Sequence, residues 1–372
     1  MEEDERHEYR QGKGFEDGFE PVVSLDLNKV KSFSDLTKAM SNTSFQGRNL
    51  GEAADILYEM IKDKDCFVVM TLAGAMTVGK MGLMITDMID KGFVNAIVST
   101  GALMAHGFIE AAGYTHFKYH QEMDDKKLYK SGYDRVYDTL ELEQNLDDSE
   151  LIVREVFRGI DHSKTTCSYK LNWELGKYLK EKVKGKGILK SAYEKKIPVY
   201  IPAFSDSEFG LDFALHNIRM KMQKKPLLRF NPFLDLENYT GTIKKQKTIG
   251  IFTIGGGVPR NWAQQVGPFL DLIRWRIQEG AEYFDAKSLK RFKYGVRICP
   301  EPVHWGGLSG CTYSEGVSWG KFVPKSEGGR WAEVLSDATV AWPIILKSVM
   351  ERVKEVKKDL PYFSEKESIY SD

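Results

Sequence analysis

The sequence is poor in cysteine and has no excess of either charge. Its four cysteines, Cys66, Cys167, Cys299 and Cys311, are widely separated and form no C-x-x-C pair, so neither a zinc cage nor a disulfide framework is indicated. The 53 basic residues are balanced by 53 acidic ones, whereas a nucleic-acid-binding surface usually needs a basic excess. These absences exclude a small disulfide-stapled scaffold and disfavour nucleic acid as a partner.

Long apolar runs are also missing. No stretch reaches the length of a membrane span, and the acidic N-terminus MEEDERHEYRQGKGFEDGFE lacks the charged-then-apolar pattern of a signal peptide. We therefore expect a cytoplasmic protein with no membrane contact. No internal repeat or low-complexity linker divides the 372 residues, a length that can bury a substantial core.

Short β-branched or apolar runs alternate with helical patterns along the chain, which is typical of βαβ units and a mainly parallel sheet. We expect strands at 66–70, 94–98, 199–201 and 249–254. Between the first two strands, residues 79–89 carry apolar side chains at helical spacing and predict one buried helix face. The pattern indicates an α/β fold of the doubly wound, Rossmann-like kind with an N-terminal helical appendage.

The same patterns predict the domain boundaries. Residues 1–20 are too polar to pack alone and are expected to form a mobile acidic arm. Residues 21–360 are expected to form one large α/β domain, followed by a C-terminal tail at 361–372. Within the domain, the charged stretch 124–150 interrupts the βα alternation and predicts a surface excursion that ends in a helix.

Three junctions between a predicted strand and the following helix are rich in small residues: 71–77, 99–102 and 255–257. Small residues there let a phosphate or ribose approach the free N–H groups of the helix N-terminus. Each junction alone is more often a tight turn, but three at the carboxyl edge of one parallel sheet predict a ligand crevice. None is a G-x-G-x-x-G fingerprint, because Arg260 stands three positions after Gly257, which disfavours an ordinary NAD dehydrogenase.

The segment GGLSGCTYSEGVSWGK, residues 306–321, combines the groups of an amine-handling site. Lys321 becomes a nucleophile if burial against an apolar wall such as Trp319 disfavours its ammonium form, and Glu315 can hold the ammonium group of a substrate. The structural alternative is a surface lysine that follows a strand. Cys311, within the segment, is interpreted as a small packing residue, because no histidine stands at a motif-like distance.

The order of these residues resembles the active-site segment of the deoxyhypusine synthase family, in which the lysine of an E-x-V-S-W-G-K run forms a covalent imine. Further elements are similar to that family's in the same order, and together they cover roughly residues 40 to 350. They are the Ser309-Gly310 pair, Thr43 to Gly51, Ile197 to Tyr200 with Pro202, Ala203 and Asp206, Gly255 to Pro259, and Ser336 to Ala338.

The resemblance implies NAD as cofactor and a homo-oligomer, expected to be a tetramer, with Lys321 and the NAD loops of different subunits meeting at an interface. Its matching positions imply an NAD site formed by Ala73, Gly74, Ala75, Thr77, Ser99, Thr100, Gly101, Asp206, Gly256, Asp337 and Ala338. Asp206 has an alternative structural interpretation as the N-cap of the helix that begins near Ser207.

The resemblance also implies a reaction. NAD takes a hydride from the carbon beside the secondary amine of spermidine, Lys321 attacks the resulting imine, and diaminopropane departs. The aminobutyl group then passes from Lys321 to an acceptor amine and is reduced. The acceptor is a protein lysine or a free diamine such as putrescine, which would make the product homospermidine. An alternative is an NAD-binding module of the same fold without transferase activity.

Three positions depart from the family's polyamine pocket. Leu211 and Leu308 stand where the family has aspartates, and Asn261 stands where eukaryotic members have a histidine. Other acidic or titratable residues nearby in sequence, including Glu301, are candidates to compensate. The residues expected to bind the amine substrate are Glu315, Trp319, Asn261, Ser309, His304, Glu208 and Asp212.

Overall fold

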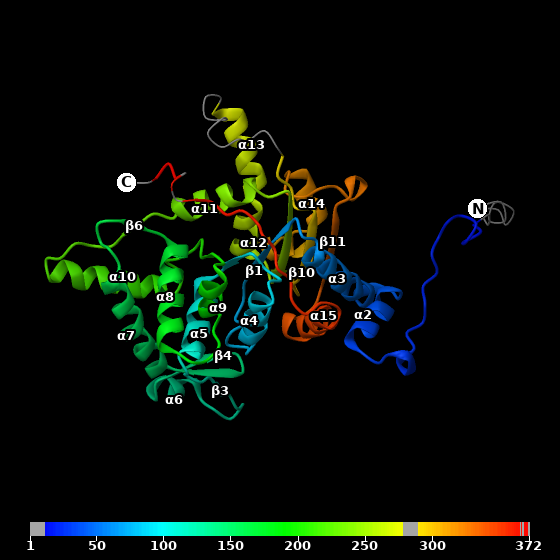
Figure 1. The fold of residues 1–372 in the computed structure, drawn as a ribbon. Coiled ribbons are helices and arrows are strands. Elements are labelled where there is room, and N and C mark those ends of the chain that lie inside the picture. The colour runs from blue at the N-terminus through cyan, green and yellow to red at the C-terminus, as the bar shows by residue number, and fades with distance from the viewer. Residues whose placement is uncertain (1–11, 278–288, 365, 367, 371–372) are drawn as a thin grey trace.

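The computed structural model describes residues 12–277, 289–364, 366 and 368–370, and its central element is a six-stranded parallel sheet (Figure 1). The strand order is β11-β10-β9-β1-β2-β7. The strands are β1 Cys66–Leu72, β2 Ala96–Ser99, β7 Val199–Tyr200, β9 Thr248–Ile254, β10 Tyr294–Ile298 and β11 Arg330–Val334. Every neighbouring pair in this sheet is parallel, which confirms the predicted α/β class.

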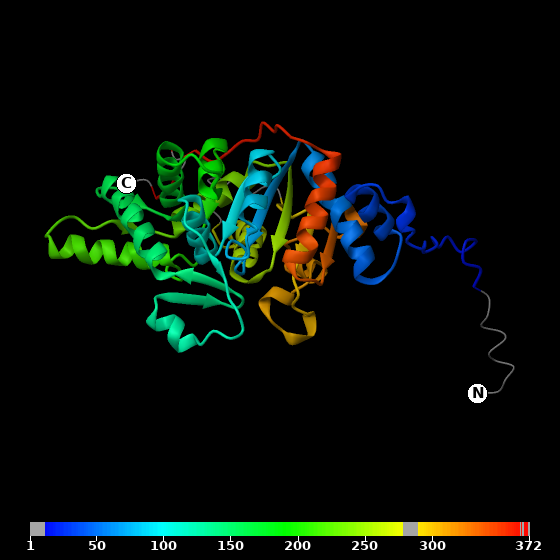
Figure 2. The same ribbon diagram turned by 90° about the horizontal axis from the view of Figure 1, so that it is seen from below.

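Both faces of the sheet are covered, which explains why its strands read as continuous apolar runs rather than alternating ones. All residues of β1 are buried. Val68 and Met70 pack into one core, whereas Phe67 and Val69 point to the opposite face and pack into a second core. The sheet therefore lies between two helical layers, which Figure 2 shows from below.

The first layer contains the helices around β1 and β2. It comprises α2 Phe33–Ser41, α3 Phe45–Lys62, α4 Gly82–Asp90, α5 Gly101–Ala111, α8 Ser168–Lys182, α9 Ile188–Lys195 and α15 Ala338–Arg352. The predicted buried face between the first two strands is confirmed in α4, where Ile85, Met88 and Ile89 are fully buried. The second layer contains α11 Phe233–Lys244, α12 Gly257–Gln264, α13 Val266–Arg276 and α14 Tyr313–Ser318.

The charged stretch 124–150 ends in a helix, as expected, and it also contributes two strands to a small antiparallel sheet that was not predicted. The sheet has the order β3-β5-β4, with β3 Phe117–Lys118, β4 Tyr133–Val136 and β5 Thr139–Leu142. Helix α6 Asp125–Lys130 precedes β4, and α7 Glu143–Gly159 follows β5 directly. Two further strands, β6 Thr165–Thr166 and β8 Arg229–Phe230, pair with each other, and α10 Glu208–Met222 lies between them in sequence.

The segments near the two ends of the chain differ in their contacts with the rest of the fold. Residues 1–11 of the predicted acidic arm lie outside the described residues, and residues 12–20 are exposed. Near the other end, Gln246 Nε2 donates to the Pro361 carbonyl at 2.6 Å, and the Phe363 amide donates to Thr242 Oγ1 at 3.0 Å. Residues 361–364 therefore pack along α11. Among the described residues, no helix combines the length and apolarity that a bilayer crossing requires.

Candidate functional site

The loops that follow β1, β2 and β9 meet at the carboxyl edge of the sheet. The Ala73 amide donates to the Ile254 carbonyl at 3.0 Å, and the Thr100 amide donates to the Leu72 carbonyl at 3.1 Å. A Cβ placed on Gly255 would lie 3.2 Å from the Ala73 carbonyl oxygen. The predicted small-residue junctions are therefore neighbours in space, as expected for a ligand crevice at this edge.

Three of the loop glycines adopt backbone angles that favour glycine. Gly74, Gly255 and Gly257 have φ angles of +81°, +77° and +63°, in the left-handed region. Gly256 is required for a different reason, because a Cβ on it would lie 2.7 Å from Ser309 Cα. The loop that contains Ser309 thus lies directly on the triple-glycine turn.

Two buried arginines hold this loop in place through its backbone carbonyls. Arg260, which is 2% exposed, donates to the Cys311 carbonyl at 2.7 Å and to the Leu308 carbonyl at 2.6 Å. Arg297 on β10 donates to the Ser309 carbonyl at 2.6 Å and also to that of Cys311 at 2.7 Å. Sequence reasoning noted Arg260 only because it interrupts the dinucleotide fingerprint, and it missed Arg297, a charged residue inside an apolar strand.

Lys321 lies just after α14, at a turn that aims its side chain along α12. Gly320 has a φ of +66°, and the Lys321 amide donates back to the Gly316 carbonyl at 2.9 Å. The half-buried Lys321 donates through Nζ to Asn261 Oδ1 at 3.0 Å. Its Nζ also lies 5.8 Å from the centre of the Trp319 ring, within the range of a cation–π contact.

The surroundings of Lys321 favour its neutral amine. Burial lowers the pKa of Lys321, and the positive charge of Arg260 lowers it further. The Cys311 thiol and the Glu315 carboxylate act in the opposite direction and raise it. The net effect is a lowered pKa, so Lys321 releases its proton more readily than an exposed lysine. A nucleophilic lysine requires this.

A cavity of about 230 Å³ opens beside Lys321 between α12 and α14. It is lined by Arg260, Asn261, Gln264, Gln265, Leu308, Cys311, Thr312, Glu315, Gly316, Trp319 and Lys321. The structure therefore brings together four residues predicted for the amine site: the lysine, its amide partner, one carboxylate and one aromatic ring. Thr312 positions the carboxylate, because its hydroxyl caps α14 by accepting from the Glu315 amide at 3.1 Å.

Other residues predicted for the amine site lie elsewhere. Ser309 lies against Gly256 on the cofactor side of the loop and does not line the lysine cavity. His304 is exposed in the short 3-10 helix Val303–Trp305 and is also not among the cavity residues. Glu208 and Asp212 are on α10, which is far from α14 in Figure 1. They lie near a family motif in the sequence, but this does not bring them to the lysine cavity of the same chain.

Glu208 and Asp212 belong instead to an acidic group that also contains Glu150 and is formed by α10 and α7. Burial raises the pKa of Asp212 to about 7, and the nearby carboxylates of Glu150 and Glu208 also raise it. Arg219 opposes this shift and also pairs with Glu150. The group is thus rich enough in negative charge to keep a proton near neutral pH.

The residues predicted for NAD divide into those in the loops at the carboxyl edge of the sheet and those whose side chains are used elsewhere. Ala73, Gly74, Ala75, Thr100, Gly101 and Gly256 belong to the loops at the carboxyl edge. Asp337 is exposed as the N-cap of α15 and accepts from the Thr339 amide at 2.7 Å, and Ala338 is buried behind it. Ser99 is fully buried at the end of β2, and Thr77 is fully buried and donates its hydroxyl to the Leu103 carbonyl at 2.8 Å, so neither side chain is exposed at this edge of the sheet.

The alternative interpretation of Asp206 as a helix N-cap is wrong. Ser207 is the N-cap of α10, because its hydroxyl accepts from the Gly210 amide at 3.3 Å. Asp206 is exposed one residue earlier. A Cβ on Gly101 would lie 2.3 Å from the Ser207 side chain, so the loop that carries Asp206 lies against the start of α5.

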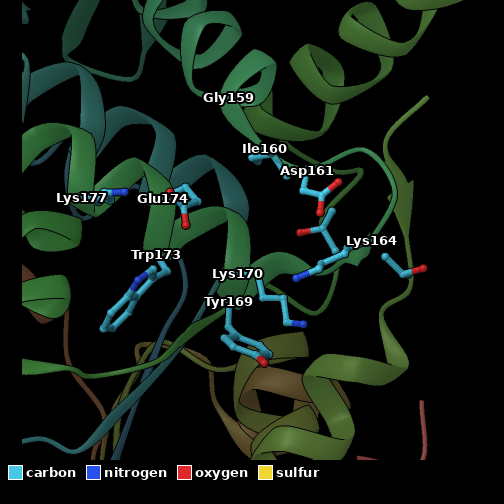
Figure 3. A pocket seen from close by; sticks show the side chains of 11 residues that line it. Gly159, Ile160, Asp161, Lys164, Tyr169, Lys170, Trp173, Glu174 and Lys177 are labelled. Carbon is cyan, nitrogen blue, oxygen red and sulfur yellow. The ribbon is translucent and has the colours of Figure 1, made fainter. Parts of the chain in front are cut away.

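A cavity of about 540 Å³, larger than the one beside Lys321, lies apart from all these residues, at the end of α7 and beside α8. Figure 3 shows its lining, which includes Lys164, Lys170 and Lys177 together with Tyr169 and Trp173. It contains no residue predicted for substrate or cofactor. Size alone therefore does not locate the functional site in this molecule.

The fold and the cavity define a class: an α/β protein whose small-residue loops meet at the carboxyl edge of a parallel sheet, with a half-buried lysine of lowered pKa beside a cavity. The model of the deoxyhypusine synthase family matches residues 35–349. The chain belongs to the deoxyhypusine synthase family, and this membership implies a transferase.

Individual relatives agree. A protein from Methanosarcina acetivorans named "Probable deoxyhypusine synthase 2" is 31% identical over 348 residues, which are 92% of this chain and 93% of the relative. A "Deoxyhypusine synthase-like protein" from Chlorobaculum parvum is 35% identical over 331 residues, or 88% of each chain. The structure of a deoxyhypusine synthase from Entamoeba histolytica matches 90% of this chain and 99% of its own with a TM-score of 0.57, and at 14% identity this likeness shows the fold alone.

Proposed function

We propose that the chain is an NAD-dependent transferase that moves an aminobutyl group from spermidine, or a related polyamine, through an imine on Lys321 to an acceptor amine. The observation that carries the proposal is the half-buried Lys321, whose pKa is lowered and whose Nζ faces a cavity with a carboxylate and an aromatic ring. Membership in the family supports the transferase class.

The loops at the carboxyl edge suit NAD. The N-termini of α5 and α12 are both at this edge, where free N–H groups and the helix dipoles favour a pyrophosphate. Gly256 lets the Ser309 loop lie against the triple-glycine turn at this edge, and the exposed carboxylate of Asp337 is available to a ribose hydroxyl. NAD bound here would accept a hydride from the carbon beside the secondary amine and return it after transfer, so no net cofactor is consumed.

The residues of the cavity have separate roles in this chemistry. Neutral Lys321 attacks the oxidised substrate carbon and carries the aminobutyl group until the acceptor amine displaces it. Asn261 holds Nζ in place by accepting its hydrogen bond. Glu315 binds a substrate ammonium group, and the indole of Trp319 offers its face to a cationic chain and shields the imine from water.

Product analysis tests the proposal and identifies the acceptor. Incubation with spermidine, an acceptor amine and catalytic NAD should release diaminopropane in an amount that exceeds the NAD present. Supplying putrescine or a lysine-containing acceptor protein in separate reactions then distinguishes homospermidine from a modified lysine. Release of diaminopropane with no aminobutyl product on the acceptor, and none on the chain, would contradict a transferase.

A second candidate is an NAD-binding module without transferase activity. It is favoured by Asn261 and Leu308, which place no titratable base and no second carboxylate at these two cavity positions. The same incubation separates the two functions, because a binding module binds NAD and releases no diaminopropane.

We also propose that the chain forms a homo-oligomer, and we expect a tetramer. Helix α10 presents an exposed apolar stripe formed by Leu211, Leu215, Ile218 and Met222, with exposed fractions of 62%, 44%, 56% and 80%. Their spacing places them on one helix face, and a stripe of this kind usually marks an interface. A second copy could also bring the acidic group of α10 to another subunit's lysine cavity.

Light scattering across a concentration series measures the assembly. Replacing Leu215 and Ile218 by serine should shift the mass toward the 42.4 kDa monomer, because it removes apolar area from the stripe. The matched control is serine at Leu83, which is exposed at 59% on α4 and should leave the mass unchanged. A wild-type mass of 42.4 kDa at every concentration would contradict the oligomer.

The pH dependence of turnover should report the state of Lys321. Because only the neutral amine attacks, the rate should rise with pH and level off above the lowered pKa of Lys321. Glu315→Gln removes a carboxylate that raises this pKa, so the rising limb should move to lower pH. The same change should raise the KM for spermidine about two- to fivefold, as expected for an exposed ion pair.

The measurement is kcat and KM as functions of pH for the wild type and two variants. Glu327→Gln, in the exposed 3-10 helix Lys325–Glu327, is the control and should leave both unchanged. A rising limb that moves to higher pH in Glu315→Gln would contradict the assigned electrostatics.

A further inference from the structure

A group of metal-binding residue types lies outside the lysine cavity and the NAD crevice. His106 on α5, His116 just before β3 and Glu141 on β5 place one possible ligand atom each within 4.8 Å of one another. Glu141 is 1% exposed and His116 is 7% exposed. We refer to these three residues as the His-Glu cluster.

The nitrogens of the His-Glu cluster converge on a single carboxylate oxygen. His106 Nδ1 lies 3.3 Å from Glu141 Oε2, and His116 Nε2 contacts the same oxygen. Yet His116 Nε2 is buried and has no hydrogen-bond partner among the described residues, so its contact with the oxygen lacks the direction of a hydrogen bond. His106 Nδ1 is hydrogen-bonded to this oxygen, so only His116 Nε2 approaches it without a hydrogen bond. A buried imidazole nitrogen that approaches a carboxylate oxygen in this way is typical of ligands that point at a shared cation.

Outer contacts orient the cluster in the manner of a metal site. Asn145 Nδ2 donates to the other oxygen of Glu141 at 2.9 Å, which leaves Oε2 directed at the imidazoles. The second nitrogen of His106, Nε2, lies 3.6 Å from Glu208 Oε1. Metal-bound histidines characteristically pair their remaining N–H with a carboxylate, which fixes the tautomer that coordinates.

We propose that His106, His116 and Glu141 bind a divalent transition-metal ion of the zinc type. Two imidazole nitrogens and one carboxylate oxygen suit Zn²⁺, whereas Mg²⁺ and Ca²⁺ prefer oxygen ligands throughout. The ligands come from three segments, so a bound ion ties the small antiparallel sheet to α5. Figure 1 shows that sheet next to α5 at the edge of the body.

The positive charge of Lys80 would repel a bound metal ion, so replacing Lys80 tests whether the cluster binds one. Its Nζ lies 2.9 Å from His116 Nδ1 and 3.3 Å from Glu110 Oε1. Coordination through His116 Nε2 requires the proton on Nδ1, so the ammonium group must turn away toward Glu110. Lys80→Gln removes the competing charge and supplies an amide oxygen that accepts from Nδ1. It should therefore tighten metal binding, an effect that a metal-free ion-pair network does not produce.

The experiment uses the full chain, freed of metal with a chelator, dialysed and titrated with Zn²⁺ alone. Calorimetry and elemental analysis should give one ion per chain, and Co²⁺ should produce a visible absorption band. Loss of a ligand in Glu141→Gln should weaken binding by more than about 100-fold, and Glu208→Gln should weaken it by about 10- to 100-fold as an outer partner. His120→Gln, at an exposed histidine four positions after His116 in the sequence, should bind like the wild type.

Lys80→Gln keeps the test valid if Glu141→Gln fails to fold, because Lys80 is largely exposed and its side chain contributes no buried core. Tighter Zn²⁺ binding in this variant supports the proposal. Absence of stoichiometric Zn²⁺ binding in the wild type overturns it. Equal Zn²⁺ affinity in the wild type, Lys80→Gln and Glu208→Gln would also overturn it, since the cluster would then be an ion-pair network only.

Discussion

Replacing Lys321 by arginine should lower the rate of aminobutyl transfer by at least about 10³-fold, which corresponds to about 4 kcal/mol of barrier. A guanidinium keeps its charge at every accessible pH and cannot form the imine. The cavity, which Lys321 lines with Asn261 and Trp319, accommodates the longer side chain at its open mouth, because Trp319 is 64% exposed. NAD binding should be largely unchanged, since the loops proposed to bind NAD are other segments of the chain.

Lys325 is the matched control. It lies four positions on in sequence, is exposed, and its Nζ is 5.6 Å from the centre of the Trp331 ring, a contact that arginine preserves. Lys325→Arg should therefore keep wild-type turnover. Product formation from spermidine and putrescine is measured for both variants. If Lys321→Arg retains more than about a tenth of the wild-type rate, a barrier loss below ~1.4 kcal/mol, Lys321 is not the nucleophile.

Adding one methyl group at Gly256 should weaken NAD binding. The Cβ of Gly256→Ala would lie 2.7 Å from Ser309 Cα and 3.1 Å from the Ser309 carbonyl oxygen. The Ser309 backbone cannot move away at a low energetic cost, because Arg297 donates a hydrogen bond to its carbonyl at 2.6 Å. Overpacking of this kind costs about 1–3 kcal/mol, so we expect the Kd for NAD to rise by about 5- to 150-fold.

The effect depends on space and not on backbone strain, since Gly256 has a φ of 177°, which any residue adopts. Gly159→Ala is the control, because a Cβ there meets nothing within 4 Å. Calorimetric titration with NAD compares the two variants with the wild type. Wild-type affinity in Gly256→Ala would show that the ligand does not depend on the contact between the triple glycine and the Ser309 loop.

Much of the fold could be predicted because strands buried on both faces leave a plain signal. The run at 66–70 is apolar throughout, and β1 is buried along its whole length. Parallel order then follows from the helical patterns between the strands, and it brings the small-residue junctions to one edge. The charged strand residue Arg297 gave no such signal, because its role depends on carbonyls of a loop that folds over it.

The candidate site could be predicted only where its residues are local. Glu315, Trp319 and Lys321 belong to one segment, and the turn at Gly320 brings them to one cavity. Glu208 and Asp212 were expected there as well, but they follow β7, which is at the far edge of the sheet from β10 and β11. Distance across the sheet is set by strand order, which a motif does not encode.

The His-Glu cluster shows the same limit. His106, His116 and Glu141 have no metal-ligand spacing in the sequence, and Glu141 comes from the charged stretch 124–150 that was interpreted as surface. Their meeting depends on the pairing of β3 with β5 and on how that sheet packs against α5. Sequence patterns predict which residue types could bind a metal, and only the tertiary fold brings them together.

Reductive trapping tests the central claim most directly. The wild type is incubated with NAD and spermidine labelled in its aminobutyl part, treated with borohydride, digested, and mapped by mass spectrometry. We predict one stable aminobutyl adduct, on Lys321, that is lost in Lys321→Arg and kept in Lys325→Arg. Label on a different residue, or no covalent label in protein that binds NAD and releases diaminopropane, would contradict the account.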